Sequence, residues 1–88
     1  MNSHIFKYEL PIIAETIELR LPKRFKICDV NFQEDKIFIW AIIDVHSDLI
    51  TRKFKIFGTG QLIENTENLS FLKTVHMPNG LVWNVFQD

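Results

Sequence analysis

The sequence has one cysteine, Cys28, a net charge of only −1, and no apolar run longer than residues 37–43. A single cysteine excludes an intramolecular disulfide and fits a reducing compartment. The balanced charge gives no long-range attraction to nucleic acid or to anionic lipid. The apolar run is far shorter than the about 20 residues that a membrane-spanning helix needs. The N-terminus also lacks the basic, apolar and small-residue order of a signal peptide, so we expect a cytoplasmic protein with no membrane partner.

Motifs for catalysis and metal binding are also missing. The sequence contains no Cys-x-x-Cys and no His-Glu-x-x-His spacing, and its histidines and cysteine do not fall in a pattern typical of a nucleophile and its base. Asp44, His46 and Asp48 alternate in a polar segment, which is more typical of a solvated loop than of a metal site. We therefore predict no catalytic residue, no metal and no cofactor, and a protein that is not an enzyme.

What the sequence does contain is a series of short apolar runs separated by turn signals: HIFKYEL, TIELRL, FKICDVNF, KIFIWAIID, TRKFKIFG, SFLKTVH and LVWNVF. Most of them alternate with period 2 and are rich in Ile, Val, Phe and Trp, which is typical of β-strands. The length of 88 residues suits one domain. The sequence therefore predicts a single all-β domain over residues 1–88, a small barrel or sandwich of about seven short antiparallel strands.

The turn signals predict how some of these strands are connected. Pro11 and Pro22 each follow an apolar run and end it, because proline has no N–H for the hydrogen-bond ladder. The polar residues 33–36 separate two runs and predict a β-hairpin. Asn79-Gly80 is a strong signal for a type I′ turn, so a second hairpin is expected at the C-terminal end.

Aromatic residues are abundant for so short a chain, with eight Phe, two Trp and one Tyr. A small sheet has few inward positions, so some of these side chains are expected on its outer face, where apolar patches usually mark partner surfaces. Residues 37–43 are apolar throughout, which indicates either a strand buried on both faces or a central strand with one face against a partner. We predict that Phe38, Trp40 and Ile42, together with Trp83, are interface residues, and that the chain forms at least a dimer.

Most of the basic residues lie in two short runs, residues 20–26 and 52–55. If these strands are neighbours, the two runs form a positive patch that holds phosphate groups, and the glycine turn that follows adds backbone N–H donors. The alternatives are a solvated face for the basic runs and a bulge or tight turn for the glycines. The candidate anion site consists of Arg24, Lys26, Arg52, Lys53, Lys55, Gly58, Thr59 and Gly60.

Six segments of the sequence form a recognisable set: FKYELP at residues 6–11, IEL at 17–19, LPK at 21–23, WAIID at 40–44, RKFKIFGTG at 52–60 and LVWNVF at 81–86. Together, and in this order along the chain, they resemble a family of small tailed-phage and prophage proteins. The resemblance implies a phage-type origin and one β-rich domain of this length, and it implies no particular reaction. In that pattern a His often follows Gly-Thr-Gly and a Gly often follows Pro-Lys, where this sequence has Gln61 and Arg24.

A small phage-type protein without catalytic groups acts by covering a surface or by sequestering a ligand. We therefore expect a non-enzymatic binding protein that occupies or inhibits a host or defence-system protein in the host cytoplasm. The alternative is a sponge that binds a nucleotide or short nucleic acid through the basic runs and the Gly-Thr-Gly turn. A third possibility is an accessory subunit of a phage particle.

Overall fold

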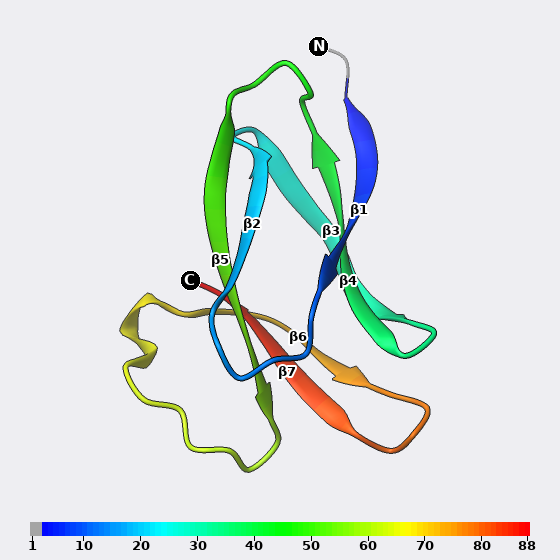
Figure 1. Cartoon of the computed structure of the whole chain (residues 1–88), viewed down its shortest axis with the longest axis vertical. Coiled ribbons are helices and arrows are strands. Elements are labelled where there is room, and N and C mark those ends of the chain that lie inside the picture. Colours follow the sequence, from blue (N-terminus) through cyan, green and yellow to red (C-terminus); the bar gives the residue numbers. More distant parts are fainter. Residues whose placement is uncertain (1–2) are drawn as a thin grey trace.

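Period-2 alternation of β-branched and aromatic residues produces an all-β structure in the computed structural model, which describes residues 3–88 (Figure 1). The strands are β1 (His4–Leu10), β2 (Ile17–Pro22), β3 (Phe25–Gln33), β4 (Lys36–Ile43), β5 (Leu49–Gly58), β6 (Ser70–His76) and β7 (Val82–Gln87). A short 3₁₀ turn, η1 (Thr66–Asn68), lies between β5 and β6. Each of the seven apolar runs forms one of these strands, so the all-β prediction is confirmed.

The strands form two antiparallel sheets that pack face to face (Figure 1). Sheet A has three strands in the order β1-β4-β3, and sheet B has four in the order β2-β5-β7-β6. Each sheet keeps two edge strands, so the fold is an open sandwich rather than a closed barrel. The chain changes sheet after β1, after β2 and again after β4, and these crossings hold the two sheets together.

β4 is the central strand of sheet A, and its side chains alternate between the two faces. Ile37, Ile39, Ala41 and Ile43 are buried between the sheets. Phe38, Trp40 and Ile42 point away from the core, and Ile42 is 37% exposed. The apolar run therefore belongs to a central strand with one open face, and burial on both faces is ruled out.

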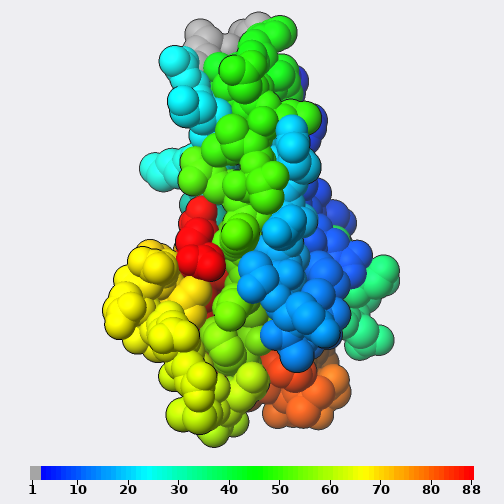
Figure 2. Space-filling view, turned by 60° about the vertical axis from the view of Figure 1, so that its left-hand side comes forward, coloured from blue at the N-terminus to red at the C-terminus, as the bar shows by residue number. Residues whose placement is uncertain are grey.

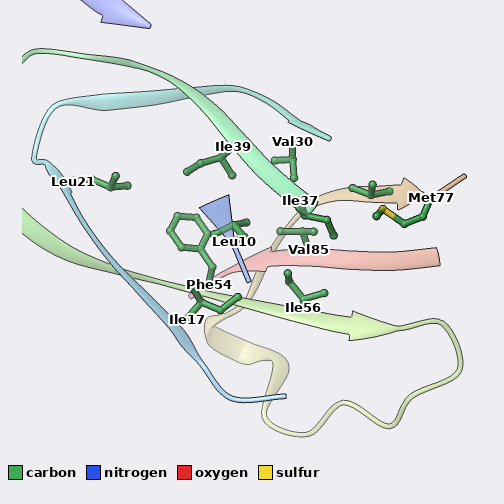
Figure 3. Packing of buried hydrophobic residues seen from close by; sticks show 11 residues of the cluster. Leu10, Ile17, Leu21, Val30, Ile37, Ile39, Phe54, Ile56, Met77 and Val85 are labelled. Atoms are coloured by element: carbon green, nitrogen blue, oxygen red, sulfur yellow. The ribbon is translucent and has the colours of Figure 1, made fainter. Parts of the chain in front are cut away.

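The core consists almost entirely of aliphatic side chains from the inner faces of both sheets (Figure 3). Phe54 is the one aromatic residue among the fully buried side chains of the described residues. Each buried Leu, Ile, Val or Phe contributes roughly 1.5–3 kcal/mol relative to an exposed one. The labelled members in Figure 3 are Leu10, Ile17, Leu21, Val30, Ile37, Ile39, Phe54, Ile56, Met77 and Val85.

One side of the sandwich is joined by an ion pair between edge strands β3 and β6. A β-bulge shifts the register of β3 at Cys28, and another shifts β6 at Leu72. Beside the bulges, Lys73 Nζ donates to Asp29 Oδ1 at 2.7 Å, and the N–H of Val30 donates to the same oxygen at 2.8 Å. The hydrogen bond from Lys73 lowers the pKa of Asp29 below its usual 3.8. Simple alternation with the buried Val30 would turn Cys28 inward, but the bulge leaves it exposed.

The Asp29–Lys73 pair predicts a small pH-dependent contribution to stability. Because the pKa of Asp29 is lowered in the folded state, this contribution is present above the unfolded pKa and is lost as the pH falls through the folded pKa. We expect Lys73→Gln to lower the free energy of unfolding at neutral pH by about 0.5 kcal/mol or less, since both side chains are partly exposed to screening. Urea denaturation from neutral to acid pH measures this difference, which should disappear as the pH falls through the lowered pKa of Asp29. Lys36→Gln, at the longer 4.0 Å pair with Glu9, is the control, and a difference that persists in acid would contradict the assignment.

The C-terminal hairpin joins β6 to β7, as predicted, but its turn is not type I′. The N–H of Gly80 donates to the carbonyl of Met77 at 3.0 Å, and the N–H of Met77 donates to the carbonyl of Leu81 at 2.9 Å. Of the turn residues only Gly80 has a positive φ, 89°. Pro78 explains the difference, because its ring holds φ near −65°, which fits the first central position of a type I turn and excludes type I′. Gly80 then takes the left-handed position that closes the hairpin.

Gly80 therefore provides a test of the hairpin geometry. Replacing Gly80 by Val should lower the free energy of unfolding by at least about 1 kcal/mol, because a β-branched residue resists positive φ. Thermal and urea denaturation measure the loss. Gly58→Ala is the matched control: Gly58 lacks a positive φ, and an added Cβ there would meet the Trp83 ring at an ordinary 3.6 Å. If both variants lost equal stability, strain at Gly80 would not be the cause.

Candidate binding surfaces

A cavity lies at the end of the sandwich where the β2–β3 turn meets the β4–β5 loop, at the upper end of Figure 1. Three hydrogen bonds hold the two segments together. The N–H of Lys23 donates to the carbonyl of Asp48 at 2.6 Å, and the N–H of Asp44 donates to the carbonyl of Arg24 at 3.1 Å. The N–H of Arg24 also donates to Ser47 Oγ at 3.1 Å. The walls of this loop cavity are therefore fixed by the backbone.

Hydrogen bonds within the β4–β5 loop stabilise it further. Ser47 Oγ donates to the carbonyl of Asp44 at 2.9 Å, and the N–H of His46 donates to Asp44 Oδ1 at 3.0 Å. The cavity has a volume of about 610 Å³, and its lining combines cations, carboxylates and small polar groups. The lining residues are Lys23, Arg24, Asp44, His46, Ser47, Asp48 and Arg52.

Arg52 enters the loop cavity from the inner face of sheet B. It pairs with Leu19 in the β2–β5 register and occupies the same side of β5 as the buried Phe54. Its guanidinium carbon lies 5.1 Å from the centre of the Phe25 ring, on the facing sheet. The Nε atom is buried and has no hydrogen-bond partner among the described residues. A buried donor without a partner is costly, so this arrangement requires a physical explanation.

The other basic residues of the predicted anion site face elsewhere. Lys53 and Lys55 lie on the outer face of sheet B, because each is an odd number of positions from Arg52 along β5. Lys26 lies on the outer face of sheet A, opposite Ile42. The predicted convergence of the two basic runs is therefore wrong as a whole. Arg24 and Arg52 do meet, and Lys23 joins them at the loop cavity.

The Gly-Thr-Gly turn is also separate from the loop cavity, since it begins six residues beyond Arg52, about 20 Å along β5. Figures 1 and 2 show the loop that follows it, in yellow-green and yellow, at the opposite end of the molecule. The N–H of Gly58 donates to Gln61 Oε1 at 3.0 Å, and Asn84 Nδ2 donates to Thr59 Oγ1 at 3.2 Å. The Gly58 donor is already occupied, and only Gly60 of this turn has a positive φ, so the structure favours a tight turn over an anion-binding nest.

The outer face of sheet A carries a second candidate surface, which we call the Trp40 patch and define as Ile5, Trp40 and Ile42. Ile5 and Ile42 are cross-strand partners on β1 and β4 and are 64% and 37% exposed. Trp40 is half-buried between Lys7 and Asp29 in the register. The patch is bordered by charged residues and by the free edge of β1, and Ile42 also lines a cavity of about 260 Å³ beside the β3–β4 strand ends. Apolar centres with charged borders are typical of protein interfaces.

The remaining interface candidates differ from this patch. Phe38 lies on the same face, but Lys7 crosses it, with its Nζ 4.5 Å from the ring centre and donating to Gln33 Oε1 at 2.7 Å. Trp83 is placed differently from the prediction. It packs against the core from the inner side of sheet B, where it pairs with Gly58 and Val75. It is therefore not part of an outer surface.

An aromatic cluster on the outer face of sheet B was not predicted. Phe57, Phe86 and Phe71 pack edge to face, with ring centres 5.6 Å and 5.5 Å apart, and Phe71 is 59% exposed. The β6–β7 register places Phe71 opposite Phe86. The hairpin signal at residues 79–80 could have indicated that β6 pairs with β7. It could not have placed Phe71 opposite Phe86, because the bulge at Leu72 shifts the register by one residue.

In the part of the chain that the structure describes, no group of three or more His, Cys, Asp or Glu side chains is arranged to hold a metal ion. The same part contains no helix of the length and apolarity required to cross a membrane. No curated protein and no solved structure matches the chain. One family model, described as a domain of unknown function (DUF7352), matches residues 1–88, and the chain therefore belongs to that family.

Proposed function

We propose that this chain is a non-enzymatic binding protein of phage type, which occupies the surface of a host or defence-system protein through the Trp40 patch. The observation that carries the proposal is the exposure of Ile5 and Ile42 beside Trp40 on the outer face of a central strand. These side chains cannot be buried by the fold, because the alternation of β4 already commits its other face to the core. Covering them requires another molecule.

The surroundings of the patch favour a protein as its occupant. β1 is an edge strand, so one row of its backbone donors and acceptors is available beside Ile5. An extended segment of a partner can pair with this edge while its side chains contact Trp40 and Ile42, as in β-strand addition. Lys7, Lys26 and Asp29 surround the patch with both signs of charge, which suits a mixed protein surface better than a polyanion. The phage-type origin rests on the sequence resemblance described above.

A second copy of the chain is the competing occupant of the same patch. The sequence prediction of a dimer through Phe38, Trp40 and Ile42 stays a prediction. Lys7 lies across Phe38, which reduces the apolar area that a symmetric dimer would bury there. Light scattering of the purified chain at micromolar concentration measures this alternative directly.

The proposal predicts that a single charge in the patch weakens partner binding. The protein captured from host lysate is purified, and its affinity for the wild-type chain and for variants is measured by calorimetry. Ile42→Glu should weaken the one-to-one complex by at least about tenfold, because it introduces an unpaired charge at the centre of an apolar contact. The variant should keep its melting temperature, since Ile42 is already partly exposed.

Phe71→Glu is the matched control, because it introduces the same charge at an exposed apolar residue on the opposite sheet. It should leave the affinity unchanged. Loss of binding with Phe71→Glu but not with Ile42→Glu would move the interface to sheet B. A wild-type chain that dimerises and loses its dimer with Ile42→Glu, with no captured protein, would replace the partner by a second copy.

A further inference from the structure

The loop cavity has features that a protein-binding patch on the other side of β4 does not explain. Arg52 is half-buried between the sheets, and its Nε is enclosed without a hydrogen-bond partner among residues 3–88. The ion pairs found among residues 3–88, Lys36–Glu9 and Lys73–Asp29, do not include it. Placing a cation in such a position is unfavourable unless an anion compensates for the lost hydration. Asp44 and Asp48 line the same cavity, but no carboxylate of the described residues forms an ion pair with Arg52.

The same cavity brings further cationic groups to Arg52. Lys23 and Arg24 line it from the β2–β3 turn, and their backbone is fixed to the β4–β5 loop by the hydrogen bonds at 2.6 and 3.1 Å. The Arg52 guanidinium packs over the Phe25 ring, with its carbon 5.1 Å from the ring centre. A planar guanidinium on a rigid support, with an ammonium group nearby, is the arrangement that binds a phosphate through charge-assisted hydrogen bonds.

The acidic part of the lining limits which phosphate compounds fit. Asp44 and Asp48 line the loop side of the cavity, where their carboxylates accept hydrogen bonds. They repel further negative charge, so a polyphosphate or a nucleic-acid strand is disfavoured. They suit a ligand whose remaining groups are hydroxyl or amine donors. The volume of about 610 Å³ is much larger than one phosphate and falls within the range typical of small-molecule sites.

We propose that the loop cavity binds a small phosphate monoester, such as a sugar phosphate or a mononucleotide, with its phosphate against Arg52, Lys23 and Arg24 and its hydroxyl groups toward Asp44 and Asp48. This site is distinct from the Trp40 patch and does not depend on the proposed partner protein. Of the basic residues predicted from the sequence, the site contains Arg24 and Arg52. Its other members, Lys23, Asp44 and Asp48, are brought together by the fold.

The experiment compares the wild-type chain with Arg52→Met and Lys23→Gln by calorimetry and thermal denaturation, using adenosine monophosphate and glycerol phosphate as probes. The wild-type chain should bind both monoesters, more weakly as salt is raised, and should melt at higher temperature when they are present. Each variant should lose affinity by at least about tenfold, because each removes a charge-assisted hydrogen bond to phosphate. Arg52→Met should keep or raise the melting temperature without ligand, because it removes a half-buried cation that has no ion-pair partner among the described residues.

Lys53→Met is the matched control, since Lys53 is the next residue on β5 and lies on the opposite face. It should bind both probes as the wild-type chain does, and so should Ile42→Glu, which separates this proposal from the Trp40 patch. Inorganic phosphate, a single-stranded oligonucleotide and a phosphoserine peptide are measured in parallel and should all bind more weakly than the monoesters.

Several results would overturn the proposal. Absence of binding by either monoester at millimolar concentration would remove the site, and unchanged affinity in Arg52→Met would place the phosphate elsewhere. Tighter binding of the oligonucleotide or the phosphopeptide would assign the cavity to a macromolecule. If inorganic phosphate bound as tightly as the monoesters, the role given to Asp44 and Asp48 would be wrong. A large fall in the melting temperature of ligand-free Arg52→Met would show that Arg52 serves packing on Phe25 instead.

Discussion

Apolar contact between the inner faces of β4 and β5 is the interaction on which the rest of this sandwich depends. Ile37 and Ile39 on one sheet and Phe54 and Ile56 on the other belong to the same buried cluster (Figure 3). Since each strand alternates with period 2, burying one set of side chains also determines which residues face outward. The Trp40 patch and the aromatic cluster of sheet B are direct consequences. A one-residue slip of either strand would bury Trp40 or Lys53 and expose the isoleucines, so the register is strongly specified.

Arg52 is the exception to this pattern, because the same alternation places a cation on an inner face. It occurs near the end of the sandwich, where the β2–β3 turn and the β4–β5 loop leave a cavity instead of closing over the core. Further along β5, Phe54 and Ile56 fill the equivalent inward positions. A residue that breaks a local rule without an internal partner is most readily explained by a ligand, since natural sequences keep such violations mainly at functional sites. Leu or Met would satisfy the packing of this position at lower cost.

Much of the fold could be predicted from the sequence, and the reasons for the failures are physical. Alternating β-branched and aromatic residues identified every strand, because burial on one face is a period-2 property of the local sequence. The turn of the C-terminal hairpin was assigned to the wrong type because Pro78, and not Asn79-Gly80 alone, decides its geometry. Cys28 is exposed although alternation with Val30 would bury it, because a bulge interrupts the alternation. Bulges depend on contacts with neighbouring strands, which the local pattern does not contain.

The candidate site was predictable only in part, for a related reason. Arg52, Lys53 and Lys55 form one basic run in the sequence, yet strand geometry sends Arg52 to the inner face and both lysines to the outer face. That separation follows from the same alternation that identified the strand. The positions of Lys23, Ser47 and Asp48 in the cavity do not follow from this alternation. They depend on the β2–β3 turn and the β4–β5 loop, which are far apart in the chain, meeting at one end of the two sheets.

The thinness of the molecule determines how its surfaces can act together. The sandwich measures 42 × 30 × 16 Å, and a core of this thickness has room between its sheets for aliphatic side chains and one fully buried aromatic ring. Most other aromatic rings must then lie at the periphery or on the outer faces, where Trp40 and Phe71 are on opposite sides. A partner that covers sheet A consequently leaves the Phe71 face open. The loop cavity shares Arg24 and Asp44 with the smaller cavity that Ile42 lines. The residue just before β3 and the residue just after β4 therefore form a wall common to both cavities.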